Sequence, residues 1–236
     1  MDVSKYQAFA KAQLGDFKNT ELLITAFTHR SYLNEHRKTA TEHNERLEFL
    51  GDAVLELIVT EYLYANYSEP EGVLTNWRSA LVRTESISEA ASRLGFETLL
   101  RLSRGEKRGS ERARQQILAN CYEAVVGAVY LEKDYKGAKG FIEKSLLPMF
   151  DEILKSGSWL DPKSRLQELV QNREGFTPMY KVLSEEGPDH DKKFTVGVFV
   201  DDEQRGEGDG PSKQAAQVLA ATQALKHYMM EEGHRP

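Results

Sequence analysis

The spacing of apolar residues changes near residue 155, and this change predicts two domains of different architecture. Before it, apolar residues recur three and four positions apart, which is the period of a helix with one buried face. After it, the run over 194–200 places apolar side chains at every second position, as in a strand. We therefore expect an all-α domain over residues 1–155, a linker over 156–161, and a small α+β domain over 162–231.

The same pattern places the individual elements. Helices are expected over residues 6–14, 19–27, 44–67, 74–94, 115–131, 137–155, 163–171 and 212–229. Strands are expected over 179–183 and 194–200. The polar, glycine-containing segment over 201–209 indicates a turn region between the second strand and the last helix.

Composition narrows the class of protein. Of 236 residues, 40% are hydrophobic and 29% are charged, which is ordinary for a globular chain and excludes a disordered one. We expect no transmembrane helix, because the chain has no long uninterrupted apolar run, and the N-terminal residues lack a secretion-signal pattern. The single cysteine, Cys121, excludes an internal disulfide and predicts a reducing, cytoplasmic environment.

The charge balance argues at first sight against a nucleic-acid partner. The chain carries 31 Lys and Arg residues against 37 Asp and Glu residues, a formal net charge of −6. A chain of this sign repels phosphates on average. The rest of the sequence contradicts that objection, because several of the carboxylates fall at one place.

Three carboxylates gather on one face of the helix expected over 44–67. At about 100° per residue, Glu48 and Asp52 lie at about 300° and 340° from Glu45, so all three share an arc of roughly 60°. The apolar residues on the opposite side, expected to face a core, are Leu47, Leu50, Val54 and Leu57.

Two interpretations of this acidic face compete. Acidic helix faces are commonly just solvated. Carboxylates three and four residues apart repel one another, however, unless cations relieve the repulsion. Phe49 lies beside these carboxylates on the nominally exposed side, which indicates either burial under a loop or contact with another subunit.

A second polar pair offers a partner for the acidic face. Asn120 and Glu123 are three residues apart in an expected helix and so share a face. If the two helices pack together, Glu48, Asp52, Asn120 and Glu123 form an oxygen-rich site of the kind that Mg²⁺ prefers. A metal ion of this type activates water and stabilises the charge of a phosphoryl transition state, so metal-assisted phosphodiester hydrolysis is the reaction class expected.

These residues resemble a known family. The run Asn-Glu-Arg-Leu-Glu-Phe-Leu-Gly-Asp over residues 44–52 closely resembles the signature of ribonuclease III, the endonuclease specific for double-stranded RNA. The runs over 28–32, 119–124 and 127–131 support the resemblance. The C-terminal part resembles a double-stranded-RNA-binding domain in the usual bacterial order, which implies the element order α-β-β-β-α.

The resemblance implies a homodimeric, Mg²⁺-dependent endoribonuclease, with Mn²⁺ as a substitute metal. It implies 5′-phosphate and 3′-hydroxyl products with short 3′ overhangs, and a part in processing precursor ribosomal, messenger and transfer RNA. The roles that it implies are metal binding for Glu48, Asn120 and Glu123; catalysis for Asp52 and Glu123; outer acidic positions for Glu45 and Glu71, with Glu71 near the partner's site; and a dimer contact for Phe49.

The chain departs from this family at Asn120, where an Asp is usual. The amide is neutral and a poorer ligand for Mg²⁺. Three explanations compete: a natural variant that still binds metal less tightly, an inactivating substitution made for study, or a protein that has lost catalysis and kept RNA binding. The last would make the chain a non-catalytic double-stranded-RNA-binding protein, although Glu48, Asp52 and Glu123 are intact.

The C-terminal domain carries the residue types that grip duplex RNA, which is recognised through phosphates and 2′-hydroxyls across the minor groove. By resemblance, Gln167 and Glu168 contact one minor groove, and the loop over 187–190, with His190, enters the next. Ser212, Lys213 and Gln214 open the last helix where its N-terminus and the lysine attract phosphate. Ser212 also suits a plain helix cap.

This domain is unusually acidic for its class. A second basic residue is usual where Gln214 stands, and a lysine is common where Asp209 stands. Residues 161–230 carry 9 Lys and Arg against 12 Asp and Glu, a net charge of −3. We therefore expect weaker and more salt-sensitive RNA docking than is typical of such domains.

Other polar residues receive structural or auxiliary interpretations. The basic residues Arg101, Arg104, Lys107, Arg108, Arg112 and Arg114 suit either a rail for RNA phosphates or a solvated loop. Cys121 is expected to be a packing residue, since nothing nearby activates it. His29 is expected to fix a turn with Ser31.

Overall fold

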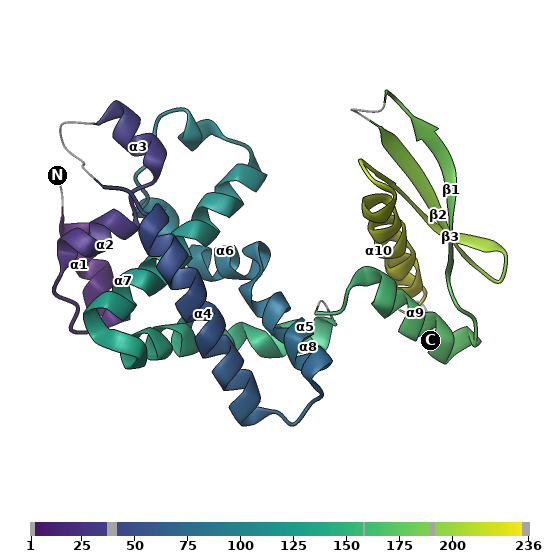
Figure 1. Ribbon diagram of the computed structural model, residues 1–236, viewed down its shortest axis with the longest axis horizontal. Helices are drawn as coiled ribbons and strands as arrows, with labels where there is room; N and C mark the ends of the chain where they lie inside the picture. Colours follow the sequence, from purple (N-terminus) through teal and green to yellow (C-terminus); the bar gives the residue numbers. More distant parts are fainter. Residues whose placement is uncertain (1–2, 37–41, 158, 189–191, 233–236) are drawn as a thin grey trace. The chain divides into compact units, whose positions relative to one another are not determined.

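The computed structural model describes residues 3–36, 42–157, 159–188 and 192–232. The chain divides into two compact units, and the boundary along the chain falls between Lys155 and Ser156 (Figure 1). Each unit is described by itself. No helix in the described part of the chain is long and apolar enough to cross a membrane.

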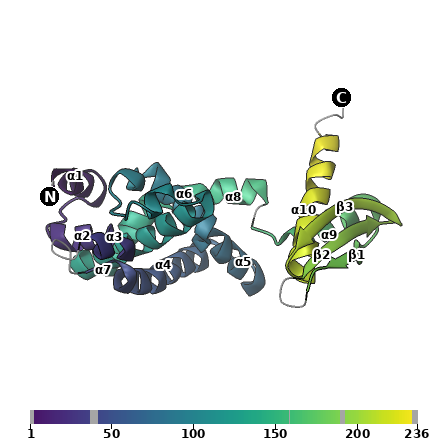
Figure 2. The same ribbon diagram turned by 90° about the horizontal axis from the view of Figure 1, so that it is seen from above.

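The first unit is all-helical, as predicted (Figures 1 and 2). Its helices are α1 (Ser4–Phe9), α2 (Thr20–Ala26), α3 (Arg30–Glu35), α4 (Glu45–Asn66), α5 (Glu71–Val82), α6 (Thr84–Arg93), α7 (Glu111–Ser145) and α8 (Phe150–Ser156). A π-helical turn, Ala10–Leu14, follows α1, and three short 3₁₀ turns occupy Phe96–Thr98, Glu106–Arg108 and Leu147–Met149.

Helices α4 and α7 form the central pair of this unit, and two glycines set how closely they approach. A Cβ atom added to Gly51 would lie 1.7 Å from the carbonyl oxygen of Glu123, and one added to Gly127 would lie 2.3 Å from that of Leu47. No other residue fits at either position without moving a backbone. The two glycines therefore permit direct backbone contact where the helices cross.

The helix expected over 74–94 is two helices. Arg83 is extended, with φ −67° and ψ 154°, and separates α5 from α6. The Ser86 hydroxyl donates to the carbonyl oxygen of Ala80 at 2.6 Å, which satisfies a carbonyl that the break leaves without its helical partner. Periodicity did not reveal this break, because apolar residues continue at helical spacing across it.

Helix α7 contains the helix predicted over 115–131 and the first part of the helix predicted over 137–155, and it is interrupted between them. It begins at Glu111 and runs to Ser145, but Lys133 and Asp134 are not helical, and Asp134 has φ 55°. The stretch before the interruption contains Asn120 and Glu123. The stretch after it ends at Ser145 and is followed by a 3₁₀ turn and α8, so the helix predicted to continue to residue 155 is broken there.

One core prediction was wrong. Leu57 was expected on the buried side of α4, but its side chain is 58% exposed. The buried face of α4 centres on Leu47, Gly51, Leu55 and Ile58, and Leu57 lies about 100° from Ile58. Leu47 and Val54 are buried as predicted.

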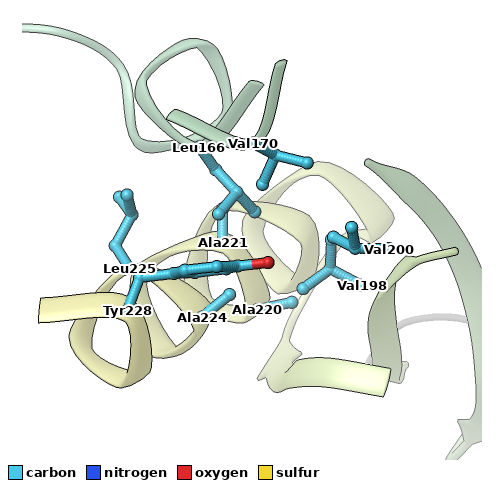
Figure 3. Close-up of a cluster of buried hydrophobic side chains, with 9 residues drawn as sticks. All are labelled: Leu166, Val170, Val198, Val200, Ala220, Ala221, Ala224, Leu225 and Tyr228. Carbon is cyan, nitrogen blue, oxygen red and sulfur yellow. The ribbon is translucent and has the colours of Figure 1, made fainter. Parts of the chain in front are cut away.

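The second unit has the element order α-β-β-β-α (Figure 1). It consists of α9 (Pro162–Glu174), β1 (Met179–Glu186), β2 (Lys193–Val200), β3 (Glu203–Gly210) and α10 (Lys213–Glu232). The strands pair antiparallel in the order β1-β2-β3, and α10 packs on β2, β3 and α9. Figure 3 shows the core between the helices and the sheet, where Leu166, Val170, Val198, Val200 and Tyr228 meet alanines of α10.

Strand β3 lies in the segment that was expected to be a turn. Only Asp201 and Asp202 turn, both with positive φ, and the ladder resumes at Glu203. The glycines of this strand face α10: a Cβ atom on Gly208 would lie 2.3 Å from the Ala220 nitrogen, and one on Gly206 would lie 2.5 Å from the Ala220 oxygen. Glycine at every second position is therefore the buried face of a strand here, and not a turn signal.

Candidate active site

The crossing of α4 and α7 brings the predicted polar residues together. Glu48 and Asp52 flank Gly51 on α4, and the carbonyl of Glu123 on α7 lies directly against Gly51. Glu48, Asn120 and Glu123 are half-buried, whereas Asp52 is exposed. Helices α4 and α7 therefore pack together as expected, and the two glycines explain why they approach so closely.

Among the described residues, no Lys or Arg side chain forms an ion pair with Glu48, Asp52 or Glu123 at this crossing. Burial, followed by the charges of Asp52 and Glu48, raises the pKa of Glu123 to about 8. Burial and the charge of Glu45 raise the pKa of Glu48, and a hydrogen bond with the Asn120 side chain opposes that rise. Each shift reflects a carboxylate that is costly to ionise in this place.

The donor set fits a hard divalent cation. Carboxylate and amide oxygens are its preferred protein ligands, and a bound cation would relieve the repulsion that raises the pKa of Glu123. The side chains do not already form a closed cage: among the described residues, no three His, Cys, Asp or Glu side chains are grouped closely enough to hold a metal ion. The amide oxygen of Asn120 accepts a hydrogen bond from Gln116 Nε2 at 2.7 Å.

The two outer acidic residues lie in different places. Glu45 is exposed at the start of α4, and its carboxylate is 3.1 Å from Arg30 Nη1. Glu71 opens α5 and borders a cavity beside Thr60. Thr60 is twelve residues, or about 18 Å, along α4 from Glu48. Within one chain, Glu45 therefore neighbours the acidic crossing and Glu71 does not.

Phe49 is exposed in the isolated chain. Its side chain is 82% exposed, so the described residues do not bury it under a loop. Leu57 and Tyr64, at 58% and 80% exposed, extend the same side of α4 into an apolar stripe. A cavity of about 480 Å³ borders the end of this stripe, between α4 and α5, and includes Leu63, Leu74 and Glu71. This stripe was not predicted from the sequence, because Leu57 was expected in the core.

In the second unit, two predicted RNA-contacting residues come together. Gln167 of α9 and Gln214 of α10 border one hollow of about 320 Å³, together with Lys163. Glu168 is exposed beside Gln167 on α9. His190 lies outside the described residues.

The start of α10 combines a cap with an ion pair. Ser212 Oγ accepts from the Ala215 amide at 3.2 Å, which is the helix-cap role anticipated for it. Lys213 Nζ lies 2.6 Å from Glu185 Oε1 of β1. Nearby, Lys193 Nζ lies 2.7 Å from Asp209 Oδ2. Both lysines thus pair with carboxylates of their own domain, which was not predicted from the sequence.

Three further predictions can be compared with the structure. Arg101 does not belong to a phosphate rail, because it is buried, donates to Thr28 Oγ1 at 3.0 Å and stacks on the ring of Tyr32. The other basic residues of that segment are exposed. Cys121 is fully buried, and burial raises the pKa of its thiol. His29 Nδ1 lies 2.8 Å from Ser31 Oγ and caps α3, so both structural roles are confirmed.

An all-helical unit with carboxylates at a helix crossing, followed by an α-β-β-β-α unit, defines a nuclease domain joined to a double-stranded-RNA-binding domain. Comparison with known proteins agrees with this class. Residues 19–150 match the family described as Ribonuclease-III-like, and residues 162–228 match the double-stranded RNA binding motif.

Whole-chain relatives lead to the same family. The chain is 44% identical over 211 residues to Ribonuclease 3 of Enterococcus faecalis, which covers 89% of this chain and 91% of the relative. It is 43% identical over 212 residues to Ribonuclease 3 of Bdellovibrio bacteriovorus, covering 89% and 90%. A solved nuclease domain of ribonuclease III from Campylobacter jejuni matches with a TM-score of 0.52 at 34% identity, over 61% of this chain and 94% of that one. The chain belongs to the ribonuclease III family of endoribonucleases.

Proposed function

We propose that this protein cleaves double-stranded RNA in a Mg²⁺-dependent reaction that leaves 5′-phosphate and 3′-hydroxyl ends with short 3′ overhangs. The observation that carries the proposal is the group of uncompensated carboxylates at the crossing of α4 and α7, marked by the raised pKa of Glu123. The double-stranded RNA binding motif in the same chain supplies the substrate class.

In this proposal Glu48, Asn120 and Glu123 hold the metal. When bound there, Mg²⁺ or its substitute Mn²⁺ supplies an activated water and charge stabilisation at the phosphate. Asp52 is the exposed carboxylate of the group and is therefore placed to orient water or substrate. Glu123 lies where its own repulsion with Asp52 and Glu48 favours a cation, so it serves both as ligand and as catalytic residue.

Asn120 is proposed to be an active variant that lowers metal affinity. Its side chain hydrogen-bonds Glu48 and thereby orients that carboxylate, which an Asp at the same position would repel. Its oxygen is engaged with Gln116 and is neutral, so it is a weaker ligand than a carboxylate. The same engagement favours the rival function, a non-catalytic protein that binds double-stranded RNA.

We propose a symmetric homodimer built on the apolar stripe of α4. A two-fold interface is self-complementary, so the exposed Phe49 of each protomer meets a pocket of the other. The cavity beside Tyr64 and Leu74 presents these two side chains and Leu63 among polar neighbours, and its volume of about 480 Å³ is enough for one aromatic side chain. Because Glu71 borders that cavity and Phe49 follows Glu48, this packing places the partner subunit's Glu71 near the acidic crossing.

We propose that the second unit grips the duplex through Gln167, Glu168 and His190 in the minor groove, and through Ser212, Lys213 and Gln214 at phosphate. Support comes from the shared hollow of Gln167 and Gln214 and from the position of Lys213 and Gln214 in the first turn of α10. Processing of precursor ribosomal, messenger and transfer RNA in the cytoplasm stays a prediction that rests on family resemblance and on the single buried thiol.

The test compares the native chain with Asn120→Asp on a long duplex RNA, across a Mg²⁺ titration. We expect both to cleave, with Asn120→Asp reaching half-maximal rate at about tenfold lower Mg²⁺, since a carboxylate replaces a neutral amide as ligand. Asn66→Asp, an exposed amide at the far end of α4, is the matched control and should match the native chain. Cleavage by neither form would overturn the enzyme and leave the RNA-binding function; cleavage by Asn120→Asp alone would show an inactivated site.

A further inference from the structure

A pocket rich in lysine lies on the helical unit, away from the acidic crossing. It occupies about 500 Å³ between the π-helical turn after α1 and the second half of α7. Four lysines border it, namely Lys11, Lys133, Lys136 and Lys144. Lys136 is thirteen residues beyond Glu123 and on the other side of the interruption in α7.

The positive charge of this pocket has no internal counter-charge. No Asp or Glu is among its lining residues in the part of the chain that the structure describes. Lys11, Lys136 and Lys144 are exposed and make no ion pair with described residues, while Lys133 Nζ donates to the Leu14 carbonyl oxygen at 2.7 Å. Four ammonium groups held together repel one another, so an anion that bridges them lowers the free energy of the protein.

The acidic residues nearest in sequence, which are Asp134, Glu132 and Glu143, form no ion pair with the pocket lysines among the described residues. Glu132 accepts from the backbone amide of Asn19. Glu143 is seven residues beyond Lys136 and so lies on the same side of the helix, but among the described residues it forms no ion pair with Lys136 or Lys144.

The backbone keeps this pocket open. Asp134, with φ 55°, interrupts α7, and two glycines follow on the side that faces the pocket. A Cβ atom added to Gly140 would meet no atom within 4 Å, so a larger residue there would occupy empty space. The deeper wall is apolar and includes Leu14, Val129 and Phe141. The pocket thus offers an apolar surface beneath a rim of cations.

We propose that this pocket binds a small organic phosphate of the nucleotide class. Its volume falls in the range of sites for small ligands. Lysine ammonium groups bind phosphate as flexible point charges, and the apolar wall suits the flat face of a base. Phosphate could also come from the backbone of RNA, and the experiment separates these two sources.

The experiment measures binding of ATP to the full chain by calorimetry in the presence of EDTA, so that no metal links the nucleotide to the acidic crossing. Inorganic phosphate and a 20-base-pair RNA duplex are the comparison ligands. We expect ATP to bind in a one-to-one ratio per protomer and at least about tenfold more tightly than inorganic phosphate, since only ATP also covers the apolar wall.

Two sets of variants locate the binding. Lys136→Gln combined with Lys144→Gln should weaken ATP binding about tenfold, whereas Lys155→Gln, an exposed lysine on α8, should leave it unchanged. Gly140→Leu should block the pocket, and Gly140→Ala should not. Both substitutions should raise the melting temperature, because glycine disfavours the helix. The melting temperatures show that loss of binding is not loss of fold.

Four outcomes would overturn the proposal. These are no ATP binding by the native chain at millimolar concentration, equal binding of ATP and inorganic phosphate, an equal loss in Lys155→Gln, and undiminished ATP binding in Gly140→Leu. If the double lysine variant loses duplex RNA binding while ATP never binds, the pocket contacts RNA phosphates and the nucleotide proposal fails.

Discussion

The two units use glycine for the same purpose and carboxylates for opposite ones. Gly51 and Gly127 let α4 meet α7, and Gly208 lets β3 meet α10, each by backbone contact. At the helix crossing, Glu48, Asp52 and Glu123 form no ion pair with any described residue. In the second unit the carboxylates Glu185 and Asp209 pair with Lys213 and Lys193.

The consequence of an acidic residue therefore depends on what the fold places beside it. At the crossing, the unpaired carboxylates create a demand for an external cation. In the second unit, the paired carboxylates occupy lysines that would otherwise face phosphate. Four predictions test this contrast, beginning with the change of largest expected effect.

Glu123→Gln should lower the rate of duplex RNA cleavage by about a thousandfold or more, because it removes both a metal ligand and the charge that favours the metal. Binding of the duplex, measured in Ca²⁺ or EDTA, should be retained. Asp151→Asn, an exposed carboxylate on α8, is the control and should keep full activity. Loss of duplex binding in Glu123→Gln would show that its role was misread.

Gly51→Ala should destabilise the helical unit by about 3 kcal/mol, since the added Cβ would lie 1.7 Å from a backbone oxygen and the helices must separate. Chemical denaturation followed by circular dichroism measures the change. Gly72→Ala is the matched control, because nothing lies within 4 Å of that Cβ and alanine favours the helix. Equal stability of the two variants would mean that the close crossing is not required.

The stability of the metal-free protein should depend on pH in the direction set by the raised pKa of Glu123. The folded-state pKa of Glu123, about 8, exceeds its ordinary value of 4.5, so the folded protein holds a proton that the unfolded chain has lost. The free energy of unfolding of the metal-free protein should therefore fall as pH rises from about 4.5 to about 8. Glu123→Gln should reduce this dependence of the free energy of unfolding on pH. An unchanged dependence would show that another group causes it.

Glu185→Gln should tighten binding of duplex RNA by roughly threefold, since it releases Lys213 from an exposed and therefore weak ion pair. The gain should shrink as salt is raised. Asp202→Asn makes the same charge change at the turn between β2 and β3, where asparagine tolerates the positive φ, and should have a smaller effect. Equal gains in both variants would indicate net charge rather than the release of one lysine.

The helical period showed α4 and the arc shared by Glu45, Glu48 and Asp52, because those depend only on spacing along one helix. It did not show how closely α7 approaches, since that depends on two glycines 76 residues apart. Phe49 was singled out correctly as an aromatic on the exposed side. Leu57 was misassigned because helix periodicity alone does not say which neighbour covers a residue.

Strand β3 shows a second limit of prediction from the sequence. Glycine is common in turns, and the alternation over Gly206, Gly208 and Gly210 resembles a flexible segment when read without its neighbour. Its meaning depends on the alanines of α10 that pack on it. The pairing of Lys213 with Glu185 was equally hidden, because it joins residues brought together only by the strand register.

The interruption of α7 at Lys133 and Asp134 has a consequence for how this domain tolerates change. In a continuous helix, inserting one residue turns everything beyond it by about 100°. Here the backbone at Lys133 and Asp134 is already non-helical, so an insertion at that point need not turn the second stretch of α7 by that amount. The two stretches of α7 can therefore change in length independently, the first constrained by the acidic crossing and the second by the buried side chains of Ala138, Phe141 and Ile142.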